Sequence, residues 1–62
     1  MIKYYGFKNK YNYDVLQIRI DFENKTYKTG QFKILSKSDI LTRKSFYNKI
    51  EKLKEMGFKN EN

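Results

Sequence analysis

Neither cysteine nor histidine occurs among the 62 residues, and this absence limits what the chain can fold into more than any other feature. A domain of this size buries only about 60% of the surface of its unfolded chain, so disulfides, metals or oligomerisation often supply the missing stability. Disulfides and the usual zinc sites need the two residue types that are missing. We therefore expect one domain over residues 1–58 and a frayed tail over residues 59–62, with a core that depends on aromatic packing or on a homodimer.

Aromatic side chains supply bulk for such a core, because the chain holds six tyrosines and five phenylalanines. Charged residues make up 34% of the sequence, above the usual figure of about a quarter, which moves the composition toward that of disordered chains. Disordered chains, however, are poor in aromatic residues and lack regular apolar patterns. We therefore expect a folded chain.

An alternation of apolar and polar side chains over residues 15–22 is the clearest pattern in the sequence. Because successive side chains of a strand point to opposite faces, this pattern predicts a half-buried strand. A first strand is expected over residues 2–7, and a third over residues 26–34 after a short turn. Gly30 is expected to mark a bulge or a bend in the third strand.

Phe46, Ile50 and Leu53 recur at spacings of four and three residues, which predicts a helix with one buried stripe. Residues 40 and 41 are apolar but lie off this stripe, so we expect a kink or a separate short turn near Thr42. Thr42 is then a suitable N-cap for the main helix.

Together these elements predict an α+β fold, a small three-stranded antiparallel sheet (β-β-β-α) with one C-terminal helix that ends at Gly57 and packs on one face. The pattern leaves the order of the strands open. The predicted core consists of Leu16, Ile18, Ile20, Phe22, Phe32, Ile34, Phe46, Ile50 and Leu53.

The residues that most enzymes use for catalysis are missing from the sequence. Nucleophilic triads, zinc centres and imidazole acid–base chemistry need cysteine or histidine. The seven carboxylates form no ligand cluster along the chain, and the three glycines are too scattered for a loop that binds phosphate. We therefore expect a binding protein that is not an enzyme and has no cofactor or metal.

Fourteen Lys and Arg residues against seven Asp and Glu residues give a net charge of +7, which favours association with nucleic acid or with an acidic protein surface. In many small domains such a charge serves solubility alone. Twelve of the basic residues are lysines, and lysine lacks the bidentate geometry that reads guanine edges. We therefore expect contact with the nucleic-acid backbone rather than sequence-specific readout.

Tyrosines are interleaved with basic residues in the first half of the chain. Bases stack on aromatic rings while Lys and Arg follow the phosphates, and a sheet that shows tyrosine to solvent is the usual platform for single strands. Tyr11 and Tyr13, in a polar loop, are the expected exposed rings, and Arg19 and Lys28 the expected phosphate contacts. The alternatives are that the tyrosines fill the core or form a protein interface.

Residues 38–58 combine a short apolar turn, the sequence Thr-Arg-Lys-Ser and a helix that ends in Leu-Lys-Glu-Met-Gly-Phe. This stretch resembles the recognition helix of winged-helix DNA-binding proteins, although strands take the place of the helices that precede it there. The resemblance implies that the start of the helix enters the major groove through Thr42, Arg43, Lys44, Ser45 and Asn48. The alternative is a helix that only covers one face of the sheet.

Two functions remain open for this composition. The first is an accessory protein that binds nucleic acid through Lys, Arg and exposed Tyr. The alternative is a phage or mobile-element protein that inhibits a host protein, such as a nuclease or a defence (anti-CRISPR-like) complex; the abundance of residues with AT-rich codons suits such a source. No apolar run approaches the roughly 20 residues of a membrane span, and residues 1–10 lack the apolar segment of a secretory signal, so we expect a cytoplasmic protein.

Overall fold

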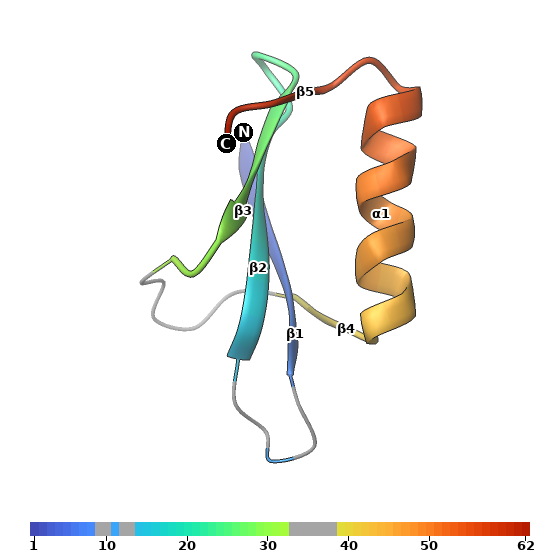
Figure 1. Cartoon of the computed structure of the whole chain (residues 1–62). Helices are drawn as coiled ribbons and strands as arrows, with labels where there is room; N and C mark the ends of the chain where they lie inside the picture. The colour runs from blue at the N-terminus through green and yellow to red at the C-terminus, as the bar shows by residue number, and fades with distance from the viewer. Residues whose placement is uncertain (9–10, 12–13, 33–38) are drawn as a thin grey trace.

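The computed structural model describes residues 1–8, 11, 14–32 and 39–62. This part of the chain contains five strands and one helix (Figure 1). They are β1 (Ile2–Lys8), β2 (Asp14–Asp21), β3 (Thr26–Gly30), β4 (Asp39–Leu41), α1 (Arg43–Glu55) and β5 (Lys59–Asn60).

The five strands form one sheet in the order β4-β1-β2-β3-β5. β2 pairs antiparallel with β1 and β3, whereas the edge strands β4 and β5 pair parallel with β1 and β3. The predicted three-stranded antiparallel sheet (β-β-β-α) is therefore wrong, because the sheet is mixed and has five strands. β4 has three residues and β5 has two, so neither is long enough to show an alternation in the sequence.

β4 also replaces the kink or turn that we expected before Thr42. Its residues pair with Tyr5, Gly6 and Phe7 of β1, which lie more than thirty positions earlier in the chain. Pairing at that distance leaves no local signal, so two apolar residues beside a helix gave no indication of a strand.

Helix α1 connects the two edges of the sheet. β4 and β5 run in the same direction, because each is parallel to a strand that is antiparallel to β2. The chain therefore passes from the β4 edge through α1 to the β5 edge, and Figure 1 shows α1 as a layer against one face of the sheet. In the described part of the chain, no helix covers the other face.

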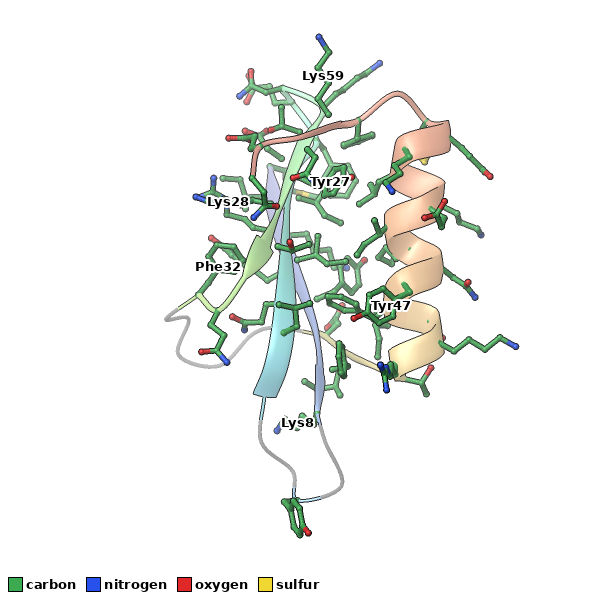
Figure 2. The ribbon with its side chains drawn as sticks, viewed as in Figure 1. Lys8, Tyr27, Lys28, Phe32, Tyr47 and Lys59 are labelled. Carbon is green, nitrogen blue, oxygen red and sulfur yellow. The ribbon has the colours of Figure 1, made fainter. Side chains whose placement is uncertain are left out.

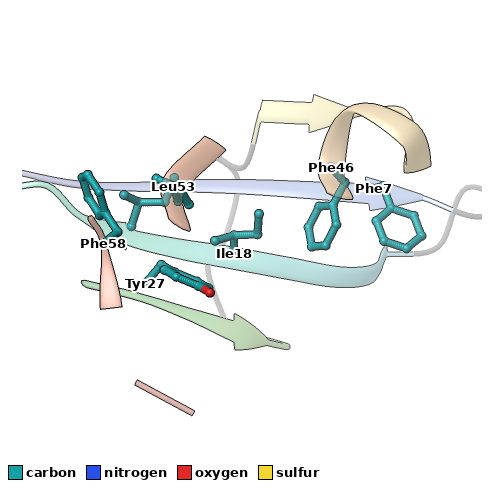
Figure 3. Close-up of a cluster of buried hydrophobic side chains, with 7 residues drawn as sticks. Phe7, Ile18, Tyr27, Phe46, Leu53 and Phe58 are labelled. Carbon is teal, nitrogen blue, oxygen red and sulfur yellow. The ribbon is translucent and has the colours of Figure 1, made fainter. Parts of the chain in front are cut away.

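The core lies between α1 and the sheet (Figure 3). Ile18 of β2 and Phe46 of α1 are completely buried, and the ring of Phe46 lies 4.8 Å from that of Phe7 in an edge-to-face arrangement. Leu16 and Ile50 pack against the margin of this core. Its buried members are Phe7, Ile18, Ile20, Tyr27, Phe46, Leu53 and Phe58.

Two phenylalanines that we expected in the core lie elsewhere. Phe22 follows the end of β2, is 39% exposed and has its ring 5.9 Å from that of Phe58. Phe32 follows the end of β3, which stops at Gly30, and its ring contacts Tyr4 on the face away from α1. Ile34 lies outside the described residues.

Both ends of α1 have the residues that the sequence indicated. The Thr42 hydroxyl accepts a hydrogen bond from the Ser45 N–H at 3.1 Å, which confirms Thr42 as the N-cap. Gly57 has a φ of 88°, and the N–H groups of Gly57 and Phe58 donate to the carbonyls of Lys54 and Leu53. This is the Schellman arrangement, in which glycine takes the left-handed position without the penalty of a Cβ.

The last four residues, where we expected a frayed tail, pair with β3. The N–H groups of Lys59 and Glu61 donate to the carbonyls of Lys25 and Tyr27. The Asn62 side chain accepts hydrogen bonds from the N–H and hydroxyl of Thr29 and donates one to the Thr29 carbonyl. The side-chain amide of Asn62 thus extends the hydrogen bonding between β5 and β3.

Candidate nucleic-acid interface

The strand register gives the sheet two chemically different faces. Paired residues of neighbouring strands point to the same face, so Tyr4, Arg19 and Lys28 form a row across β1, β2 and β3. Their neighbours Ile18, Ile20 and Tyr27 point to α1 and are buried. We call the side that carries Tyr4, Arg19 and Lys28 the open face, and these three residues the central row. Figure 2 shows Lys28 and Phe32 on this side and Tyr27 on the side of α1.

A flat row beside the central row makes room for Phe32. It consists of Gly6, Gln17 and Gly30, of which only Gln17 carries a side chain. The Phe32 N–H donates to the Gln17 side chain at 2.6 Å, and a Cβ on Gly30 would lie 3.8 Å from the Phe32 ring. The ring of Phe32 therefore rests where the sheet presents little more than backbone.

Tyr4, Phe32 and Arg19 meet on the open face. The two rings are 5.8 Å apart with an angle of 61° between their planes. The Arg19 guanidinium lies 5.9 Å from the centre of the Phe32 ring, within range of a cation–π interaction. Tyr4, Arg19 and Phe32 are each half-buried, whereas Lys28 is exposed. The arrangement combines two rings with two adjacent cations.

Acidic groups lie at the margins of the open face rather than in the central row. Asp21 is on the same face of β2, but its carboxylate accepts hydrogen bonds from the backbone N–H groups of Glu23 and Asn24 and from the Asn24 side chain. These bonds, with that of the Asn24 side chain foremost, lower the pKa of Asp21 below its usual 3.8. Glu61 follows β5 at the edge of the sheet, two residues after Lys59, which pairs with Thr26 on the open face. Within the described residues, neither Arg19 nor Lys28 forms an ion pair.

The outward surface of α1 has a mixed charge. Lys54 forms an ion pair with Glu51 at 3.5 Å. A hollow on one flank of α1 is lined by Ser45, Asn48, Lys49 and Lys52. The hollow holds two lysines and no aromatic side chain, and elsewhere on α1 Glu51 and Glu55 lie between lysines along the chain. This surface therefore lacks the combination of cations and rings found at the central row.

Two lysines near the β4 edge are engaged with groups of the protein itself. The ammonium groups of Lys49 and Lys3 lie 4.3 and 5.1 Å from the centre of the Tyr5 ring. Lys3 also pairs with Asp39 at 3.3 Å, and hydrogen bonding to Tyr5 and then to Asp39 raises the pKa of Lys3. These contacts fasten α1 and β4 to β1.

The seven residues that the sequence indicated as a site do not lie together. Arg19 and Lys28 are neighbours in the central row. Tyr11 is 68% exposed and lies between β1 and β2, and Tyr13 is outside the described residues. The remaining three, Arg43, Lys44 and Asn48, are exposed on α1, on the opposite side of the sheet from the central row.

Tyr4 and Phe32 lie on the open face but were not among the seven site residues that the sequence indicated. Tyr4 stands next to Tyr5 in a run without alternation, so only the pairing with β2 decides which ring points away from α1. Phe32 lies two residues after Gly30 and four after Lys28, so it falls on the same side as these residues, the open face, and not in the core where we expected it.

Comparison with protein-family models, with curated proteins and with solved structures finds no match for this chain. Among the described residues, no three carboxylates come together as a set of metal ligands. In the same residues, no helix has the length and apolar character needed to cross a membrane.

Proposed function

We propose that this chain is a non-enzymatic protein that binds nucleic acid through the open face of its sheet. The observation that supports this most is the central row, where Arg19 and Lys28 stand side by side next to the rings of Tyr4 and Phe32. Cations that follow a phosphate backbone and rings on which bases stack are the two elements of sequence-tolerant nucleic-acid binding.

The charge of the whole molecule supports the same proposal. A net charge of +7 attracts a polyanion from a distance, and the open face then holds it at short range. Lys59 pairs with Thr26 beside Lys28, so three cations are available on this face. Three phosphate contacts to a single strand predict that log K falls with log salt with a slope of about −2.

Binding of nucleic acid through α1 has less support than binding through the open face. The resemblance to a recognition helix places Arg43, Lys44 and Asn48 in a groove of DNA, and all three are exposed. α1, however, is the one helix of the described residues and packs flat on the sheet, without the supporting helices that present a recognition helix.

A protein partner is the second candidate, and the exposed apolar side chains favour it. Ile2 of β1 and Ile40 of β4 are 49% and 51% exposed and flank the residues of the open face. Apolar residues beside tyrosine and arginine are also typical of protein interfaces. On this reading the chain would be an inhibitor or adaptor that docks on an acidic protein.

Fluorescence anisotropy with labelled DNA and RNA oligonucleotides at low salt tests the proposal. We expect binding that weakens steeply as salt is added, without dependence on sequence. Absence of binding to both single- and double-stranded probes would rule the proposal out. A pull-down from lysate with and without nuclease then separates the two candidates, because a protein partner is retained at full stoichiometry after nuclease treatment and a nucleic-acid-mediated one is lost.

A further inference from the structure

We infer that the ligand of the open face is single-stranded nucleic acid, and that one of its bases stacks in the corner formed by Tyr4 and Phe32. This inference rests on the proposed function and narrows it to one class of nucleic acid and one subsite. It is carried by the shape of the open face, the angle between the two rings and the position of the cations around them.

The shape of the open face suits a strand whose bases are unpaired. A duplex shows its base faces only at its ends, and its major groove is read by a helix or a two-stranded ribbon that enters it. The central row lies in the middle of a sheet face, flanked by β4 and β5 at the two edges. Rings in such a position can reach a base that is turned out of a stack and cannot reach one inside a duplex.

The angle between the two rings indicates how many bases they accept. With 61° between the planes and 5.8 Å between the centres, Tyr4 and Phe32 cannot both lie parallel to successive bases of one stack. A base that stacks on one ring meets the other ring with its edge, which is a favourable geometry for aromatic groups. The pair therefore forms a subsite for one base.

The cations surround this subsite on the β2 and β3 side. Arg19 lies beside Phe32, and Lys28 is the next residue across the sheet at a strand spacing of about 4.8 Å. A guanidinium next to a ring extends the stacking surface, and the exposed lysine is free to follow the phosphates. No acid of the described residues lies in this row. A single strand of nucleic acid fits this surface, because its phosphates suit the cations and an unpaired base suits the rings.

Tyr4→Leu is the direct test, with Tyr47→Leu as the matched control. Tyr47 is a half-exposed tyrosine of α1 on the opposite side of the sheet, where its ring contacts Phe7 and Phe46. The probe is a labelled mixed-sequence single strand of about 12 nucleotides, a length within the usual range of single-strand sites. We expect Tyr4→Leu to weaken binding by about tenfold with an unchanged salt slope, and Tyr47→Leu to leave binding within about twofold.

Two further measurements keep the inference testable if Tyr4→Leu does not fold, which circular dichroism will show. Tyr4→Phe keeps the ring and is expected to bind as the unaltered chain does. With the unaltered chain, an unlabelled single strand is expected to displace the probe at least tenfold better than the duplex of the same sequence. Equal competition by the duplex, or full binding by a folded Tyr4→Leu, would overturn the inference and leave the proposed function standing. Absence of binding to any probe would overturn both.

Discussion

Asp21 shows how one side chain shapes the turn between β2 and β3. Its carboxylate accepts three hydrogen bonds from Glu23 and Asn24, and Lys25 completes the turn with a φ of 53°. Asparagine adopts the left-handed conformation more readily than most residues other than glycine, so Asn24 would be the usual residue for this position. Asn24 is instead held by Asp21, and the next residue takes the positive φ.

The lowered pKa of Asp21 affects how the free energy of unfolding changes at acid pH. Hydrogen bonding to Asn24 lowers its pKa in the folded chain, so the ionised carboxylate stabilises the fold above the pKa of the unfolded chain, which is near the usual 3.8. This contribution is lost as the pH falls through the lower folded pKa. We expect the urea midpoint of Asp21→Asn to fall less between about pH 6 and pH 2 than that of the unaltered chain. Equal falls would show that the Asp21 hydrogen bonds do not favour the ionised form.

The side chain of Asn62 is expected to stabilise the folded chain. Its side chain forms three hydrogen bonds with Thr29, all of them exposed. We expect Asn62→Ala to lower the free energy of unfolding by about 1 kcal/mol, measured by urea denaturation. Glu61→Ala is the control, because it keeps the backbone bond from Glu61 to Tyr27. If both variants unfold at the midpoint of the unaltered chain, the last four residues do not contribute to the sheet.

At the scale of elements, α1 begins with the wrong sign of charge for its dipole. Its first turn contains Arg43 and Lys44 and no acidic residue, although the N-terminus of a helix carries a partial positive charge. Lys52 and Lys54 in the last turn have the favourable sign. The start of α1 therefore gives up a few tenths of a kcal/mol of stability.

Lys44→Glu separates stability from binding. Because glutamate favours the start of a helix, we expect the free energy of unfolding to rise by about 0.5 kcal/mol, measured by urea denaturation, with Lys44→Gln in between. Nucleic-acid affinity is expected to stay within about twofold, since Lys44 lies on the opposite side of the sheet from the central row. A large loss of affinity in the more stable variant would favour contact through α1.

The elements also show how far the sequence determined the fold. β1 is rich in strand-forming residues, β2 and α1 have apolar patterns of their own, and the caps at Thr42 and Gly57 are local, so each was predictable. β4 and β5 exist only through pairing with distant strands, and pattern alone does not reveal such pairing. The same holds for the candidate site: alternation placed Arg19 on the polar face of its strand, but the side on which Tyr4 and Phe32 lie follows only from the register of β1, β2 and β3.

At the scale of the whole molecule, the sheet separates two surfaces with different charge arrangements. The open face has Arg19 and Lys28 next to two rings, with its acids at the margins. The outward surface of α1 has lysines interleaved with glutamates, one pair of them in contact. Both surfaces contribute to the net charge of +7, and we propose that nucleic acid binds to the open face.

A pair of charge reversals with identical net effect tests this assignment most directly. Lys28→Glu changes the open face and Lys52→Glu changes the outward surface of α1, and each lowers the net charge from +7 to +5. Both affinities are measured by anisotropy with one single-stranded probe at one low salt concentration. We predict that Lys28→Glu weakens binding by about tenfold and that Lys52→Glu leaves it within about twofold. Equal losses, or a larger loss for Lys52→Glu, would contradict binding through the open face.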